Sequence, residues 1–224
     1  MRLLSDSIGR KVVMAITGLL MVLFVVGHLL GNLSIFAGPN GINAYAEKLH
    51  GLPQVVWATR VVMLTAVALH IVLSIRLTLE NRAAKPTAYA VDRRLRVTFA
   101  GKNMIWTGLL LGGFIAFHLL HFTVRSVPGL DIVQGLDGHG RFDVFSMVVA
   151  AFFGHVVTAV VYVVAMAALY LHLSHGIQST FQSLGLNNAK TMPGFLKFGS
   201  VLSVIFLLGY GSIPVAIFFG LIAK

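Results

Sequence analysis

Cysteine is absent from the 224-residue chain, and acidic residues are scarce, with seven Asp and Glu in total. Without cysteine, the chain carries no disulfide bond, iron–sulfur cluster, thiolate-bound zinc or cysteine nucleophile. Charged residues of both signs make up only 11% of the sequence. A water-soluble domain with so few charges would expose large apolar patches and aggregate. The composition therefore argues against a soluble protein and favours one that lipid surrounds.

Long apolar runs are abundant, since 57% of the residues are hydrophobic. About twenty helical residues at about 1.5 Å each cross the ~30 Å hydrocarbon layer, and a helix satisfies its own backbone hydrogen bonds there. We therefore predict an all-α integral membrane bundle that forms a single domain over residues 1–224, without an internal repeat. Its five transmembrane helices are expected at residues 12–36, 55–79, 103–124, 145–173 and 198–223.

Basic residues are distributed unequally between the two sides of this bundle. They outnumber acidic residues seventeen to seven, for a formal net charge of +10. The side of the N-terminus carries Arg2, Arg10, Lys11, Arg76, Arg82, Lys85, Arg93, Arg94, Arg96, Lys102, Lys190 and Lys197. The other side carries Lys48, Arg60, Arg125, Arg141 and Lys224. Because Lys and Arg are enriched in cytoplasmic loops, we expect a cytoplasmic N-terminus. We assign the basic excess to topology and to docking of an acidic partner, not to nucleic acid.

Histidine is the residue that points to chemistry. Seven of the nine histidines fall within or at the ends of the first four predicted spans: His28, His70, His118, His121, His155, His172 and His175. Polar side chains are costly in lipid, so each of these histidines needs a partner. With no cysteine and almost no carboxylate in the spans, ligation by histidine alone favours haem, and less strongly copper or zinc.

The heights of the histidines place four of them in two layers. At about 1.5 Å per residue, His28 lies roughly 25 Å and His118 roughly 22 Å from the cytoplasmic boundary. His70 lies about 10 Å from that boundary, and His172 comes near the cytoplasmic end of its helix. One histidine from each of four helices would then hold two stacked haems, one in each layer.

Other polar residues at these heights are candidates for hydrogen bonds to the ligands or for contacts with haem propionates. In the outer layer these candidates are His121, His155, Arg125 and Arg141. In the inner layer they are His175, Arg76 and Arg93. We interpret the three extra histidines in these roles rather than as iron ligands.

Four local strings resemble one known family. They are Gly27-His28-Leu29-Leu30-Gly31-Asn32, Leu69-His70-Ile71, Phe117-His118-Leu119-Leu120-His121 and His172-Leu173-Ser174-His175-Gly176-Ile177-Gln178-Ser179-Thr180-Phe181. Together they resemble the single-chain, di-haem cytochrome b membrane anchor of succinate dehydrogenase and fumarate reductase complexes. The resemblance covers nearly the whole chain, with five helices and histidines on the first four.

This resemblance implies particular ligands. In the family, the first and third helices ligate the haem distal to the catalytic subunits, and the second and fourth ligate the proximal haem. That implies His28 with His118 for a distal haem b and His70 with His172 for a proximal haem b. The resemblance also selects His172 over His175.

The resemblance further implies partners and a place in the cell. The partners are a flavoprotein subunit with FAD, which oxidises succinate or reduces fumarate, and an iron–sulfur subunit. Both would lie on the cytoplasmic side of a bacterial-type cytoplasmic membrane. The substrate of this chain would be a membrane quinone, menaquinone by the same resemblance.

Quinone chemistry moves protons as well as electrons, so it needs a titratable group beside the distal haem. Glu47 and His50 lie in the outer loop between the first two spans, and family members use an acidic residue on that side. Some members also carry a glutamate two residues before the proximal ligand, where this chain has Tyr170. We therefore do not expect proton transfer through the fourth helix.

Two other functions are compatible with the sequence. A haem-free transporter or proton relay would use the intramembrane histidines without visible absorbance. A cytochrome b anchor of a different dehydrogenase would keep both haems and change only the soluble partners.

Overall fold

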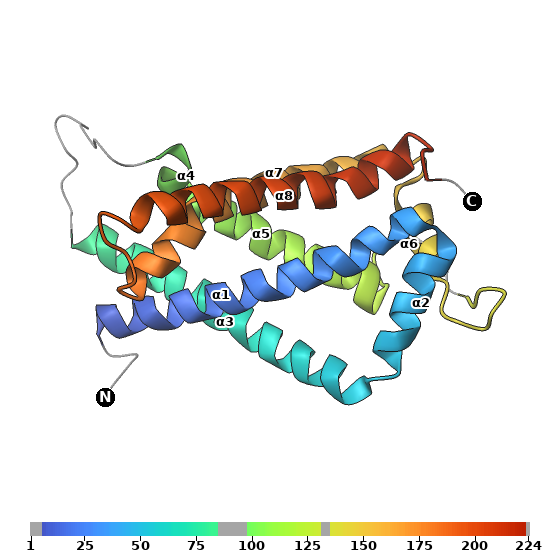
Figure 1. Cartoon of the computed structure of the whole chain (residues 1–224), viewed down its shortest axis with the longest axis horizontal. Coiled ribbons are helices and arrows are strands. Elements are labelled where there is room, and N and C mark those ends of the chain that lie inside the picture. Colours follow the sequence, from blue (N-terminus) through green and yellow to red (C-terminus); the bar gives the residue numbers. More distant parts are fainter. Residues whose placement is uncertain (1–5, 85–97, 131–134, 223–224) are drawn as a thin grey trace.

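Long helices dominate the computed structural model, which describes residues 6–84, 98–130 and 135–222 (Figure 1). The longest are α1 (Ser7–Leu33), α3 (Pro53–Ala83), α5 (Met104–His118), α7 (Val156–Ser183) and α8 (Met192–Phe218). Within the described residues these give five stretches long and apolar enough to cross a membrane. The predicted all-α bundle with five membrane-spanning helices is therefore confirmed.

The helices begin and end at residues that suit those positions. The Asp6 carboxylate caps α1 by accepting the backbone N–H of Gly9, and Pro53 opens α3, where its missing N–H costs nothing. A 3₁₀ turn (Ser34–Ala37) extends α1 as far as Gly38, whose φ of 77° is readily adopted by glycine. The chain then turns into α2 (Pro39–His50), which runs from α1 towards the start of α3 (Figure 1).

Four helices surround a common axis. α1 packs against α3 and α7, and α5 packs against the same two helices, so α1 lies diagonally opposite α5. α8 packs along α7 and also contacts α1. We call the end where α1 begins the inner end and the end where α8 finishes the outer end. Side chains from diagonally opposite helices can meet on the axis of this arrangement.

The fourth span differs from the prediction of 145–173. α6 (Val144–Phe152) is a separate helix, and α7 begins only at Val156. Phe153 has an extended backbone and Gly154 has a φ of 76°, so no helix continues through them. Because hydrophobic residues flank this break on both sides, the prediction from the apolar run joined two helices into one span. α7 instead continues to Ser183, which places His172 in its middle and not near its cytoplasmic end.

Asn43 holds the outer end together. Its side chain is fully buried, and its amide nitrogen donates to Asp137 and Asp143 at 3.2 Å each. Its amide oxygen accepts the backbone N–H of Phe145 at 2.9 Å. Asp137 in turn accepts the Nε–H of Arg141 at 2.8 Å. These bonds tie the outer loop and the start of α6 to α2.

We predict that Asn43→Ala destabilises the protein by about 1–3 kcal/mol, because it leaves buried groups without partners. Thermal unfolding in detergent measures the effect. The matched control is Asn40→Ala on the same helix, where the exposed side chain accepts only one bond, from Arg141. Equal loss of stability in the two variants would contradict the central position of Asn43.

The same network predicts a pH dependence. The hydrogen bond from the Arg141 guanidinium holds the pKa of Asp137 below its usual range. A carboxylate with a lowered pKa stabilises the fold fully above its unfolded pKa of about 4 and loses that contribution as the pH falls towards the folded value. The stability difference between wild type and Asp137→Asn should therefore be constant above about pH 5 and shrink below about pH 4. A difference that grows on acidification would contradict this sign.

Candidate functional site

Two histidine pairs meet across the bundle. In the outer pair, the rings of His28 on α1 and His118 on α5 have centroids 6.0 Å apart and planes at 82°. In the inner pair, the rings of His70 on α3 and His172 on α7 have centroids 6.4 Å apart and planes at 63°. No other two histidine rings face each other in this way in the described part of the chain. The partners in each pair are those that the sequence predicted.

The spacing of these pairs can be compared with that of two imidazoles on one metal ion. A metal lies about 2 Å from an imidazole nitrogen, and about 1.1 Å more reaches the ring centre, so two ligands on opposite sides have centroids about 6 Å apart. The observed 6.0 and 6.4 Å match this distance. All four side chains are half-buried. His121, one turn beyond His118, is only 1% exposed. Each pair therefore has the ring spacing of two imidazoles on opposite sides of one metal ion.

The number of ligands distinguishes a haem from a bare ion. Among the residues that the structure describes, no three or more His, Cys, Asp or Glu side chains gather where they could hold a metal ion. Zinc and copper sites draw three or four ligands from the protein. A haem brings its own four nitrogens and needs only axial ligands. Two isolated histidine pairs therefore fit two haems better than zinc or copper.

Hydrogen bonds orient the inner pair. The Nδ1 of His70 lies 3.1 Å from the Met14 carbonyl oxygen and 3.4 Å from the Thr17 hydroxyl. The Nδ1 of His172 lies 3.1 Å from the Thr107 hydroxyl. A carbonyl only accepts, and each hydroxyl already donates its own proton to backbone carbonyls of its helix. Nδ1 therefore carries the ring proton in both histidines, and the Nε2 lone pair is left for an axial bond.

Glycines give the inner imidazoles room. A Cβ on Gly18 would lie 3.2 Å from Cε1 of His70, and one on Gly108 would lie 3.3 Å from Cε1 of His172. Either distance is tighter than ordinary van der Waals contact. Gly108 therefore serves the inner pair, although it lies on the same helix as His118.

The threonines were missed at the sequence level, although a repeat marks them. α1 carries Met14, Thr17, Gly18, Phe24 and His28, and α5 carries Met104, Thr107, Gly108, Phe114 and His118 at the same spacings. These five shared positions form a short repeat between the two helices. In each helix a Met-x-x-Thr-Gly motif precedes a histidine by the same number of residues. This pattern within two apolar helices was visible in the sequence.

Tyr162 on α7 orients the outer pair. Its buried hydroxyl lies 3.2 Å from Nδ1 of His118 and 3.0 Å from Nδ1 of His121. His121 lies in a π-helical turn (Leu119–Val124) that follows α5, and its Nε2 is buried without a hydrogen-bond partner in the described structure. π-turns occur often at functional sites, and an unpartnered buried nitrogen is costly. His121 therefore belongs to the surroundings of the outer pair.

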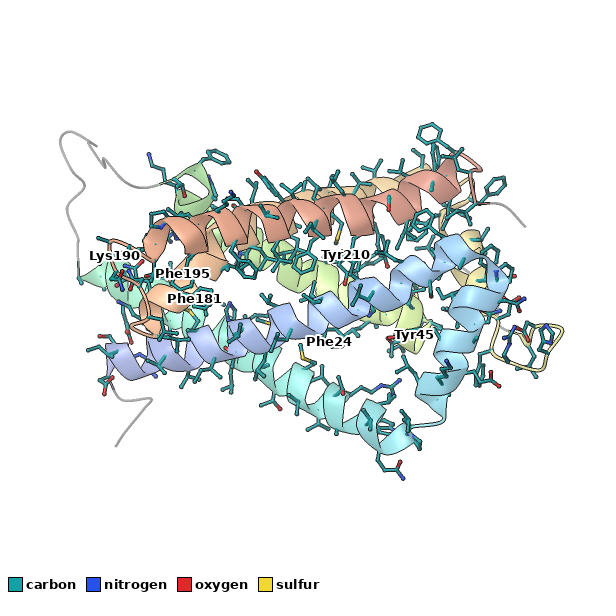
Figure 2. The ribbon with its side chains drawn as sticks, viewed as in Figure 1. Phe24, Tyr45, Phe181, Lys190, Phe195 and Tyr210 are labelled. Atoms are coloured by element: carbon teal, nitrogen blue, oxygen red, sulfur yellow. The ribbon has the colours of Figure 1, made fainter. Side chains whose placement is uncertain are left out.

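Aromatic residues cover His28. Phe24 stacks on its ring with centroids 5.4 Å apart, and the Tyr210 ring lies 6.0 Å away. Figure 2 shows Tyr210 between α8 and α1, where its hydroxyl donates to the Val25 carbonyl at 2.7 Å. α8 carries no histidine, and this contact shows how it contributes to the outer layer.

His175 differs from His172 in its hydrogen bonding. The amide nitrogen of Gln178 lies 2.9 Å from Nδ1 of His175, and an amide nitrogen can only donate. Nδ1 of His175 therefore accepts, and in the neutral ring the proton is on Nε2. Its ring packs against Gly101 of α4 (Phe99–Lys102), away from the inner pair.

The arginines predicted to contact haem propionates lie in different surroundings. At the inner end, Arg76 pairs with Glu80 at 3.0 Å, and Glu80 also binds the buried Arg10 of α1 at 2.7 Å. Sequence reasoning missed this role of Arg10, which lies two residues before the first predicted span and inside α1. Arg93 lies outside the described residues.

At the outer end, the guanidinium of Arg141 donates to Asp137 and to Asn40, so it serves the loop network. Arg125 is exposed, with a left-handed φ of 60°. His155 is exposed at the start of α7, within range of an electrostatic interaction with His121.

The two quinone-site candidates lie together on α2. Glu47 and His50 are both exposed, one turn apart. The Nδ1 of His50 lies 2.8 Å from the Ala46 carbonyl, and its ring lies 4.8 Å from that of Phe142. Tyr45 on the same helix packs against Gly31, about one turn beyond His28. α2 therefore lies against the outer-pair end of α1.

Comparisons of the chain with protein-family models, with curated proteins and with solved structures find no match.

Proposed function

We propose that this chain is the membrane anchor and electron-transfer subunit of a succinate:quinone oxidoreductase or quinol:fumarate reductase. In this role it links an iron–sulfur subunit at the inner end with a membrane quinone near the outer end. The observation that carries the proposal is the two histidine pairs, each with ring centroids about 6 Å apart and no third protein ligand among the described residues. The choice of dehydrogenase rests on the sequence resemblance described above.

Each residue of the two pairs has a role in this proposal. His70 and His172 would hold the haem nearer the soluble subunits, and His28 and His118 would hold the outer one. Thr17, Thr107 and Tyr162 keep the ligand rings oriented. Two bound haems supply one-electron carriers at two depths of the ~30 Å apolar layer. Because two histidines would hold each haem, the group would supply one-electron transfer rather than oxygen chemistry.

Charge at the inner end supports a soluble partner there. Arg82, Lys102, Lys190 and Lys197 are exposed at the inner ends of four different helices or their connections. Figure 2 shows Lys190 at this end of the bundle. Basic surface of this kind steers an acidic partner surface into place. An iron–sulfur subunit with acidic residues around its cluster fits that requirement.

The outer end supports the quinone step. Glu47 and His50 provide exposed titratable groups on α2. An apolar groove between α5 and α7, lined in part by Phe114, Phe117 and Val161, opens beside the outer pair. A lipid-soluble ring with a long apolar tail can enter such a groove from the membrane. Protons would then exchange through the α2 side.

We predict two haems b per chain in the purified protein, measured by a reduced-minus-oxidised spectrum and by haem quantitation. His28→Ala or His118→Ala should remove one haem, and His70→Ala or His172→Ala should remove the other. His155→Ala, at an exposed position, is the control and should keep both.

The outcomes separate the competing functions. Absence of haem from the wild-type protein would favour a transporter or proton relay and reject our proposal. Two haems together with co-purified subunits of another dehydrogenase would keep the electron-transfer role and reject the succinate or fumarate assignment. Loss of the same haem from His28→Ala and His70→Ala would reject the pairing.

We predict that Glu47→Gln lowers quinone-linked turnover about 10- to 100-fold, because the amide cannot take up a proton. Succinate oxidation with a soluble dye as acceptor should be unchanged in the same complex. Lys48→Gln, on the adjacent exposed position, is the matched control. Full quinone turnover in Glu47→Gln would reject Glu47 and move the assignment to His50.

A further inference from the structure

We propose that Thr107 and Thr17 are positioning residues that set the reduction potential of the haem at the inner pair, with the larger effect at Thr107. This inference rests on the proposed function and deepens it, because that proposal gives the two hydroxyls only an orienting role. It follows from the contacts of the inner pair and from the repeat shared by α1 and α5.

The two threonines occupy equivalent positions. Each lies eleven residues before an outer-pair histidine on its own helix, and each reaches an inner-pair histidine on the next long helix. Both side chains are buried, at 5% exposure for Thr17 and 7% for Thr107. Each is followed by the glycine that makes room for the same imidazole. One Thr–Gly pair therefore fixes the ring of His70, and the other fixes the ring of His172.

The direction of each hydrogen bond follows from the hydroxyl proton. Thr17 donates to backbone carbonyls three and four residues earlier, at 3.0 and 2.9 Å. Thr107 does the same at 3.1 Å in both cases. The remaining lone pairs face the imidazoles, so both histidines donate from Nδ1. Donation from Nδ1 raises the basicity of the ring as a ligand.

A more basic axial ligand stabilises ferric iron relative to ferrous iron. Hydrogen bonding around an axial ligand is one of the means by which a protein tunes a haem potential. The hydroxyl contacts therefore lower the potential of the inner haem, and their removal raises it. An electron arriving from the soluble partner would then pass more readily from the inner site to the outer one.

The two contacts differ in length, and so their effects should differ. At His70 the Met14 carbonyl makes the shorter contact, 3.1 Å, and Thr17 the longer, 3.4 Å. At His172 the Thr107 hydroxyl itself accepts at 3.1 Å, with an added interaction from the Met104 carbonyl. Removal of Thr17 leaves His70 its nearer acceptor. Removal of Thr107 takes away the 3.1 Å contact of His172 and leaves it only the interaction with the Met104 carbonyl.

A redox titration followed by absorbance tests this inference on the purified complex. Thr107→Val should shift the oxidised-to-reduced ratio of the inner haem about tenfold towards reduced, which is about 59 mV upward for a one-electron couple. Thr17→Val should shift it in the same direction by less. The potential of the outer haem is the internal control and should not move.

Matched variants separate the hydroxyl from the shape of the side chain. Thr107→Ser and Thr17→Ser keep the hydroxyl and should retain the wild-type potential. If Thr107→Val fails to bind the inner haem, Thr107→Ala removes the hydroxyl without added bulk and gives the same measurement. An unmoved potential in Thr107→Val or Thr107→Ala, or an equal shift in Thr107→Ser, would overturn the inference.

Failure of this inference and failure of the proposed function give different results. Wild-type protein without haem would reject the proposed function. Two haems with an unmoved inner potential in both hydroxyl-free variants would reject only the role of the threonines.

Discussion

Lipid imposes the constraint on which this structure depends, because a polar side chain in the membrane interior needs a partner within the protein. His70, His118 and His172 meet that requirement through neighbouring hydroxyls or a carbonyl, and His28 lies against the rings of Phe24, His118 and Tyr210. Diagonal placement of α1 with α5 and α3 with α7 brings the rings to the bundle axis. The apolar outer surfaces of the same helices face the membrane. The distribution of polar and apolar residues along each helix therefore determines both its contact with lipid and the position of its histidine.

The two layers satisfy this requirement differently. In the inner layer, each histidine has its own threonine on the preceding long helix. In the outer layer, the hydroxyl of Tyr162 is shared between His118 and His121. A shared hydroxyl can donate to only one of two rings, so the protonation of His118 and His121 is linked. The inner layer has no such link between its two ligands.

Much of the fold and the pairing of histidines could be predicted from the sequence, because length, hydropathy and helical rise act over whole helices. The heights place His28 at the level of His118 and His70 nearer the other end, and the family resemblance selects His118 and His172 as their partners. Features that depend on one residue's backbone or one side chain's direction could not be predicted. Gly154 ends α6 inside an apolar run, and Thr107 reaches a histidine 65 residues away in sequence. Neither feature changes the hydropathy that guided the prediction.

The repeat on α1 and α5 divides the long helices into two halves, α1 with α3 and α5 with α7, and each ring pair takes one member from each half. Neither half alone can therefore complete a binding site. A macrocycle held by either pair would connect the two halves of the chain. A group bound between the rings of either pair would therefore strengthen the contact between the two halves, which α1 also makes directly with α7.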